Sequence, residues 1–215
     1  MSVGTETAAD RAHEYLRGAI MRGELTGGTM LSENELAARL SMSRTPVRAA
    51  LVRLQQEGWV TIYPQRGALV RSIELGELQE SAQMRHALET CGVHRSTEHT
   101  RSRARATLTE NLAQQESVLA SGAFDGFAPL ALQFHRGFVE LAQNQLMLVA
   151  YDRLQDRQLF SINQSAPRIA GDPALVIAEH RTLMTAALDG DQHAFSDALD
   201  AHQTRSHGFE DGRPG

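Results

Sequence analysis

Residues 32–58 contain two short helix patterns separated by only a few residues, and this spacing constrains the fold more than any other feature of the 215-residue chain. A capping-box pattern at Ser32 predicts a helix that continues to Leu40. The next residues leave room only for a tight turn, after which Ser43 caps a second helix that ends before Gly58. Two short helices joined by such a turn predict a helix-turn-helix.

Strand-forming residues follow this pair of helices. Residues 59–63 are rich in β-branched and aromatic side chains, and a turn with proline and glycine separates them from a second strand at 68–71, which predicts a β-hairpin. A further helix, capped by Asp10 and closed by Gly23, is expected before the pair. We therefore expect a winged helix-turn-helix domain over residues 10–71.

The second helix of such a pair enters the major groove of DNA with its N-terminal end first. That end, together with the tip of the predicted hairpin, carries hydrogen-bond donors that suit phosphates and base edges. Apolar residues from Val47 to Leu54 occupy the opposite face and are expected to pack inward. Arg53 is either a DNA contact or an ion-pair partner within the domain. The candidate DNA-binding residues from these patterns are Ser43, Arg44, Thr45, Arg48, Arg66 and Gly67.

The distribution of charge also favours contact with DNA by this part of the chain. The formal net charge of the whole chain is -5, but residues 39–71 contain six arginines and one acid. A basic segment on an acidic body is typical of a DNA-contacting module attached to another domain, although a solvated charged face has the same composition. An architectural protein that binds DNA without sequence preference would need a broader basic surface.

The cysteine content and the N-terminus bear on the compartment. A single cysteine, Cys91, excludes an intrachain disulfide and a cysteine-based zinc site, and is typical of a reducing environment. No apolar run reaches the length of a membrane span, and residues 1–10 lack the pattern of a signal peptide. We therefore expect a cytoplasmic protein with no membrane partner.

The chain beyond residue 77 has a helical pattern throughout. About 130 residues of amphipathic helix can bury a core of their own, so we expect an independent all-α domain over 77–208, after a linker at 72–76. Residues 1–9 and 209–215 are expected to be disordered. The fold class is therefore mainly α, with a winged helix-turn-helix and a helical bundle. The helices of the bundle are expected at 77–97, 103–120, 125–143, 145–163, 173–188 and 191–207.

Three histidines, His135, His180 and His202, lie on apolar faces of these helices. His180 lies ten residues before Gly190, where a tight turn joins the last two helices, and His202 lies twelve residues after it. At about 1.5 Å per residue, the two imidazoles should lie at nearly the same level on facing helices. A lone histidine on an apolar face is normally a hydrogen-bonded core residue, but burying several imidazoles together without a shared partner is costly. A divalent metal such as zinc or nickel would remove that cost.

The first domain resembles the DNA-binding domain of the GntR family of bacterial transcription regulators, most specifically in the core S-R-T-P-V-R. The matching run is GGTMLSENELAARLSMSRTPVRAALVRLQQEGWVTIYPQRGALV. The family contacts DNA through the two arginines and the threonine of this core and a glycine at the wing tip. The resemblance assigns these roles to Arg44, Thr45, Arg48 and Gly67. Many members also read a base with an arginine early in the preceding helix, where this chain has Asn34, so Asn34 is a further candidate and a different operator preference is implied.

The second domain resembles the FCD ligand-binding domain of the FadR subfamily over residues 77–207. Metal-binding members use three histidines and an aspartate four residues before the first of them, and Ala131 stands at that aspartate position here. The resemblance implies either a three-histidine site with an open coordination position, which we favour, or a metal-free pocket. The motifs that carry it are R-x-x-x-E at Arg85 and Glu89, F-H at Phe134 and His135, E-H at Glu179 and His180, A-L-x-G-D at 187–191, and His202.

Arg85 is the candidate effector-binding residue, because the family often has this arginine near the ligand. An ion pair with Glu89 between helices is an equal alternative.

These features indicate a one-component transcription regulator, in particular a repressor. It would bind a two-fold-symmetric operator as a homodimer and respond to a small-molecule effector, for which the family suggests a carboxylate. A metal-free pocket with a non-carboxylate effector is the alternative within the same fold. A histidine-metal hydrolase is the alternative from a different class. The chain lacks H-E-x-x-H, G-x-S-x-G and phosphate-loop motifs, and Glu179 projects about 100° from the ligand face, so we do not expect an enzyme.

Overall fold

The computed structural model describes residues 6–122 and 124–207. The chain divides into two compact units after Glu74. No helix of the described residues is long and apolar enough to cross a membrane.

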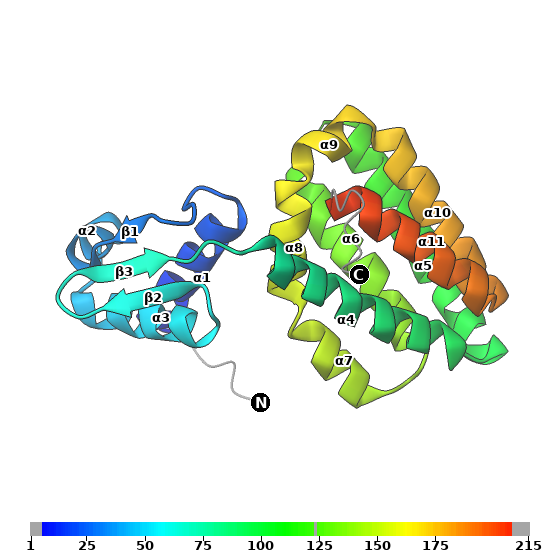
Figure 1. Ribbon diagram of the computed structural model, residues 1–215, viewed down its shortest axis with the longest axis horizontal. Coiled ribbons are helices and arrows are strands. Elements are labelled where there is room, and N and C mark those ends of the chain that lie inside the picture. Colours follow the sequence, from blue (N-terminus) through cyan, green and yellow to red (C-terminus); the bar gives the residue numbers. More distant parts are fainter. Residues whose placement is uncertain (1–5, 123, 208–215) are drawn as a thin grey trace. The chain divides into compact units, whose positions relative to one another are not determined.

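The N-terminal unit is a winged helix-turn-helix, as the sequence predicted (Figure 1). Its three strands form an antiparallel sheet in the order β1-β3-β2. The sequence predicted only the β2–β3 hairpin, because the two residues of β1 are too few to show a strand pattern. The elements are α1 (Ala8–Met21), β1 (Met30–Leu31), α2 (Glu33–Arg39), α3 (Arg44–Gln56), β2 (Val60–Tyr63) and β3 (Gly67–Val70).

The start of α1 differs from the prediction that Asp10 caps this helix. Thr7 is the N-cap, and its side chain accepts a hydrogen bond from the backbone N–H of Asp10, while the Asp10 carboxylate accepts from Thr7. The two side chains form a capping box, so the helix begins three residues earlier than expected. Residues 8 and 9 are therefore helical rather than disordered, and residues 1–5 lie outside the described part.

The apolar faces of α1 and α3 pack against each other to form the core of this unit. The residues predicted to pack inward from α3 are buried. The buried side chains of the two helices include Leu16, Ile20, Val47, Leu51 and Leu54. The packing fixes α3 so that its other face points away from the core.

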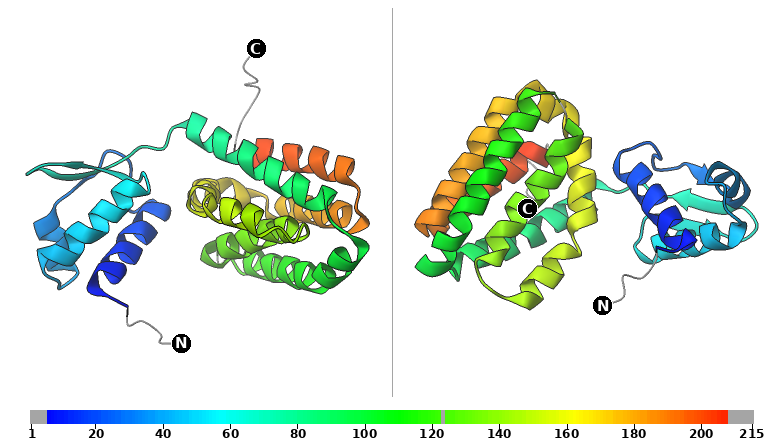
Figure 2. Two further views of the ribbon diagram at one scale, coloured as in Figure 1. Left: turned by 90° about the horizontal axis from the view of Figure 1, so that it is seen from below. Right: turned by 180° about the vertical axis from the view of Figure 1, so that it is seen from behind.

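The C-terminal unit is all-α, as predicted. Helix α6 packs against α4, α5, α7 and α8, while α10 packs against α5 and α11, and α11 also packs against α4. Figure 2 shows α5 and α10 side by side. The elements are α4 (Leu75–His94), α5 (Glu98–Ala120), the 3-10 turn η1 (Phe124–Gly126), α6 (Phe127–Glu140), α7 (Gln145–Asp152), α8 (Gln155–Gln164), α9 (Ala166–Gly171), α10 (Pro173–Asp189) and α11 (Gln192–His207).

Several boundaries in this unit differ from the predictions. Helix α5 begins at Glu98, five residues before the predicted start at 103. Helix α4 begins at Leu75, so the linker predicted at 72–76 is shorter. The helix predicted at 145–163 is two helices, α7 and α8, which meet at a turn that no glycine or proline marks. Pro167 was expected to lie in a break between helices, but it lies in the first turn of α9. A backbone N–H at that position has no acceptor within the helix, so proline is tolerated there. The predicted tail at 209–215 lies outside the described residues.

Helices α4 and α6 approach each other closely at Gly92. A Cβ atom at this position would lie 2.2 Å from the carbonyl oxygen of Phe138 and 2.8 Å from Cα of Val139, both backbone atoms of α6. Phe134 and Phe138 of α6 are fully buried beside this contact. Gly92 thus sets the distance between the two helices that carry much of the candidate site.

Candidate nucleic-acid interface and metal centre

The N-terminal unit contains a cavity of about 360 Å³ between α2, the start of α3 and the β2–β3 turn, which we call the α2–α3 groove. The groove brings together five of the seven predicted DNA-binding residues: Asn34, Arg44, Arg48, Arg66 and Gly67. Ser43 and Thr45 are exposed at the start of α3 but do not line it. Ser43 occupies the N-cap position, yet its side chain makes no capping hydrogen bond to α3, contrary to the expected cap.

Glu33 also lines this groove, and sequence reasoning missed it. Its carboxylate lies 3.4 Å from Nη2 of Arg44 and 4.0 Å from Nε of Arg48. Both arginines are largely exposed, so these ion pairs contribute little to stability. Arg44 and Arg48 are one helical turn apart, so their guanidinium groups lie on the same side of α3, where both come within 4.0 Å of Glu33.

Gly67 has a role within the sheet in addition to its predicted proximity to DNA. Its φ is +108°, and a Cβ atom there would lie 2.3 Å from the carbonyl oxygen of Leu31. Only glycine lets β3 pair with β1 in this way.

Of the two roles considered for Arg53, the structure shows the contacts of an ion-pair partner within the domain. Its guanidinium lies 3.2 Å from Glu57 and 3.5 Å from Asp10, which links α3 to α1. Glu57 also contacts the buried His13 of α1 at 2.8 Å.

In the C-terminal unit, His135 of α6, His180 of α10 and His202 of α11 form a triple-histidine centre. Their ring centroids are 5.1 Å (His135–His180), 5.3 Å (His135–His202) and 4.8 Å (His180–His202) apart. One ring nitrogen of each lies within 4.8 Å of the others, and all three residues are buried. The predicted common level of His180 and His202 is confirmed.

Each imidazole of this centre is held through Nδ1 by an oxygen acceptor. His135 donates to Glu89 Oε2 at 2.9 Å, His180 to Gln115 Oε1 at 2.6 Å, and His202 to Glu179 Oε2 at 2.7 Å. A hydrogen on Nδ1 leaves the lone pair of a neutral imidazole on Nε2. The three acceptors therefore select the tautomer that binds a metal through Nε2.

Glu89, Gln115 and Glu179 were not predicted as partners of the histidines. Glu89 and Glu179 belong to the motifs of the sequence, but nothing in the sequence indicated Gln115. Glu179 contacts the Nδ1 side of His202 and also pairs with Arg205, so it is an orienting group rather than a base facing the centre.

Burial sets the protonation of these groups. Desolvation lowers the pKa of His180 and of His202 well below the usual value, and the neighbouring imidazoles lower it further. Burial raises the pKa of Glu89 to about 7, although the charge of Arg85 and a hydrogen bond from Tyr151 act in the opposite direction. Neutral imidazole is the form that a metal requires.

Arg85 contacts Glu89 and lines the same cavity as the triple-histidine centre. Its Nε is 2.9 Å from Glu89 Oε1, so the ion pair forms, but within α4 rather than between helices as expected. Its Nη2 is buried and has no hydrogen-bond partner among the described residues. Arg85, Ala131 and the three histidines all line one cavity of about 30 Å³.

The donor set fits zinc or nickel. Three buried imidazoles, each with Nδ1 against an oxygen acceptor, supply three ligands, and the small side chain of Ala131 leaves the wall of the cavity without a carboxylate. A space of about 30 Å³ holds an ion or a water molecule but not a large organic molecule.

Comparisons with known proteins agree with both halves of this description. Residues 8–70 match the family described as "Bacterial regulatory proteins, gntR family", and residues 80–205 match the FCD domain. The chain is 27% identical over 202 residues to the HTH-type transcriptional repressor RspR of Escherichia coli (strain K12), covering 92% of this chain and 86% of that protein. It is 28% identical over 196 residues to a probable D-xylose utilization operon transcriptional repressor of Paenarthrobacter nicotinovorans, covering 91% and 85%.

Solved structures share the fold. The structure titled "E. coli McbR/YncC" superposes with a TM-score of 0.75 at 20% identity, covering 94% of this chain and 96% of that one. A putative GntR regulator from Rhodococcus sp. RHA1 has a TM-score of 0.76 at 20% identity with the same coverage.

Proposed function

The chain belongs to the GntR family of bacterial transcription regulators with an FCD domain, and we propose that it represses transcription as a homodimer under the control of a metal-dependent carboxylate effector. The winged helix-turn-helix is its DNA-binding domain, and the FCD domain is its effector-binding domain. Two relatives named as repressors support the direction of regulation. Because the described part of the chain has one α2–α3 groove, two copies would be needed to read a two-fold-symmetric operator.

The observation that carries the metal assignment is the set of oxygen acceptors on the three Nδ1 atoms. A buried imidazole needs an acceptor for its N–H in any setting, but here all three histidines use Nδ1 for that contact, which leaves the three lone pairs on Nε2. Metal-binding histidines normally have such a partner, because it fixes the ring and raises its basicity. We infer that His135, His180 and His202 hold a divalent metal, zinc or nickel, by Nε2.

The effector class follows from charge. A divalent ion held by three neutral ligands keeps its full positive charge and supplies an attachment point for an anion. Arg85 adds a second cation whose Nη2 has no hydrogen-bond partner in the described part of the chain. A carboxylate group can bind the metal ion and accept a hydrogen bond from Arg85. A larger effector would require the helices around the cavity of about 30 Å³ to move, which would couple binding to a change of conformation.

Elemental analysis of protein purified without an affinity tag tests the metal. We expect close to one zinc or nickel ion per chain in the wild type and loss of the metal in His180→Ala. His193→Ala is the matched control, because His193 is exposed on α11 and lies outside the centre. A metal-free wild type with an intact fold would contradict the proposal and would support a polar pocket with a different effector class.

Arg48→Ala tests the reading of DNA. We expect weaker binding by about 1–3 kcal/mol and a relaxed preference at one or two bases. Selection from a random DNA library, carried out with the wild type and with the variant, measures the base preference of each protein. The selected sequences should be inverted repeats if a homodimer binds. Arg53→Ala is the control with unchanged preference, because Arg53 pairs within the unit. Uniform weakening on all sequences would make Arg48 a phosphate contact instead.

A further inference from the structure

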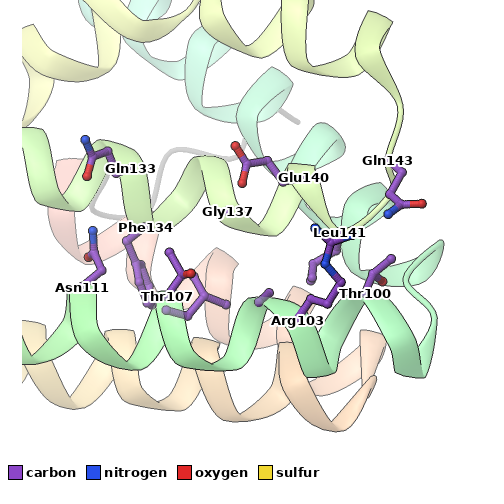
Figure 3. A pocket seen from close by; sticks show the side chains of 12 residues that line it. Thr100, Arg103, Thr107, Asn111, Gln133, Phe134, Gly137, Glu140, Leu141 and Gln143 are labelled. Atoms are coloured by element: carbon purple, nitrogen blue, oxygen red, sulfur yellow. The ribbon is translucent and has the colours of Figure 1, made fainter.

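A second hollow in the C-terminal unit, the α5–α6 groove, lies outside the triple-histidine centre. It has a volume of about 310 Å³, within the range of sites for small molecules. Figure 3 shows Asn111, Thr107 and Arg103 in succession along α5, facing Gln133, Gly137 and Glu140 along α6. None of these residues has a role in the functions described so far.

The polar groups of this groove have unused hydrogen-bonding capacity. Asn111 is only 8% exposed, and its Oδ1 accepts from Gln115 Nε2 at 2.7 Å. Within residues 6–122 and 124–207, the amide nitrogen of Asn111 has no hydrogen-bond partner, and Arg103, which is exposed, has no ion pair. A nearly buried amide that lines a cavity with an unpaired N–H₂ group is suited to an acceptor on a ligand.

The spacing of these groups sets the shape of a ligand. Arg103 and Asn111 are eight residues apart on one helix, which is about 12 Å along its axis. Between them the groove is lined by the buried apolar residues Leu108, Phe134 and Leu141. A matching ligand has an acid group at one end, an apolar middle and a hydrogen-bond acceptor at the other end.

The lining favours a small molecule over a protein partner. The centre of a protein interface is normally apolar and aromatic, with few charges. The large exposed apolar side chains of this unit lie on other helices, α4, α7 and α10: Leu75, Met84, Leu146, Val149 and Leu175. The α5–α6 groove is concave and polar at its rim instead.

Two contacts connect this groove to the triple-histidine centre. Gln115 joins Asn111 to His180, because it donates to the former and accepts from the latter at 2.6 Å. Phe134 lines the groove and stacks on the imidazole of His180, with ring centroids 4.9 Å apart. A ligand that holds Asn111 would therefore also restrict the acceptor that orients His180.

We propose that the α5–α6 groove binds a small elongated organic anion, with its acid group at Arg103 and its distal oxygen at Asn111, and that this ligand changes the metal affinity of the triple-histidine centre. The second half rests on the function proposed above; the first half does not.

The binding half is tested by nuclear magnetic resonance on isotope-labelled full-length protein, with ω-hydroxyhexanoate as the probe. We expect shifts of the Asn111 side-chain amide and of the backbone around Arg103, and weaker binding of hexanediol, which lacks the carboxylate. Arg103→Gln should weaken probe binding by about tenfold or more, because it removes a charge-assisted contact. Arg105→Gln, an exposed arginine of α5 outside the groove, should bind as the wild type does.

Three results would overturn the binding half: shifts confined to the surroundings of the three histidines, no shifts at millimolar probe, or equal binding by Arg103→Gln and the wild type. If a second copy of the chain covered the groove, the probe would cause no shifts even at millimolar concentration.

The coupling half is tested by zinc affinity, measured by competition with a coloured chelator with and without saturating probe. We expect the probe to change the zinc affinity of the wild type severalfold and to leave that of Arg103→Gln unchanged. The unchanged affinity of the variant would exclude direct binding of zinc by the probe. Asn111→Ala should weaken zinc binding by about tenfold, because Gln115 loses its buried partner. An unchanged affinity in probe-saturated wild type would refute the coupling, whereas a wild type that binds no zinc at all would refute the metal centre itself.

Discussion

Gly92→Ala is expected to lower the free energy of unfolding of the C-terminal unit by about 3 kcal/mol or more. The added methyl group would lie 2.2 Å from the carbonyl oxygen of Phe138, and backbone atoms cannot rotate away as a side chain can. Helices α4 and α6 must therefore separate. Because α4 carries Glu89 and α6 carries His135, separation would also disturb the triple-histidine centre.

Urea unfolding followed by circular dichroism measures this effect, at equal protein concentration because assembly would shift the transition. Gly76→Ala is the matched control on the same helix, since a Cβ atom there meets nothing within 4 Å; it should be neutral or stabilising by up to about 1 kcal/mol. Trp59 is the only tryptophan and is buried in the N-terminal unit, so its fluorescence reports that unit separately. Equal stability of Gly92→Ala and Gly76→Ala would show that the helices tolerate a wider spacing.

Local signals in the sequence predicted the N-terminal unit well, because capping residues, a short turn and strand-forming residues act within a few positions. The two-residue strand β1 escaped prediction, since its pairing with β3 is a contact between residues far apart in the chain. Asp10 was misassigned for a local reason: Thr7, three residues earlier, is also a capping residue, and Asp10 completes its capping box. Pro167 was read as a break although a helix accepts proline in its first turn.

The candidate metal centre was predictable in part. The tight turn at Gly190 fixes the register of α10 and α11, and this register is enough to bring His180 and His202 to one level. The third member, His135, and the acceptor Gln115 come from α6 and α5, whose rotation depends on how all the helices pack. No spacing in the sequence determines that rotation, so Gln115 could not be found.

Glu89→Gln is expected to lower the stability of the metal-free protein by about 3–5 kcal/mol, because Arg85 would remain buried without its counter-charge. The same change should weaken zinc binding by about tenfold to a hundredfold. A glutamine can accept from His135 through its oxygen, but its N–H₂ group must then face Arg85 and the hydroxyl of Tyr151, which donates to Glu89 at 3.0 Å. Urea unfolding in the presence of a chelator and zinc competition measure the two effects separately.

The double variant Arg85→Met/Glu89→Leu separates the two roles of Glu89. Removing both charges replaces a buried ion pair with apolar side chains of similar size, which is commonly neutral or stabilising, so stability should return to within about 1 kcal/mol of the wild type. The hydroxyl of Tyr151 keeps an acceptor in Gln158, at 3.3 Å. Zinc affinity should stay low, because His135 has lost the acceptor that fixes its tautomer. If the double variant recovered zinc binding as well as stability, Glu89 would act only by neutralising Arg85, and the orientation of His135 would not depend on it.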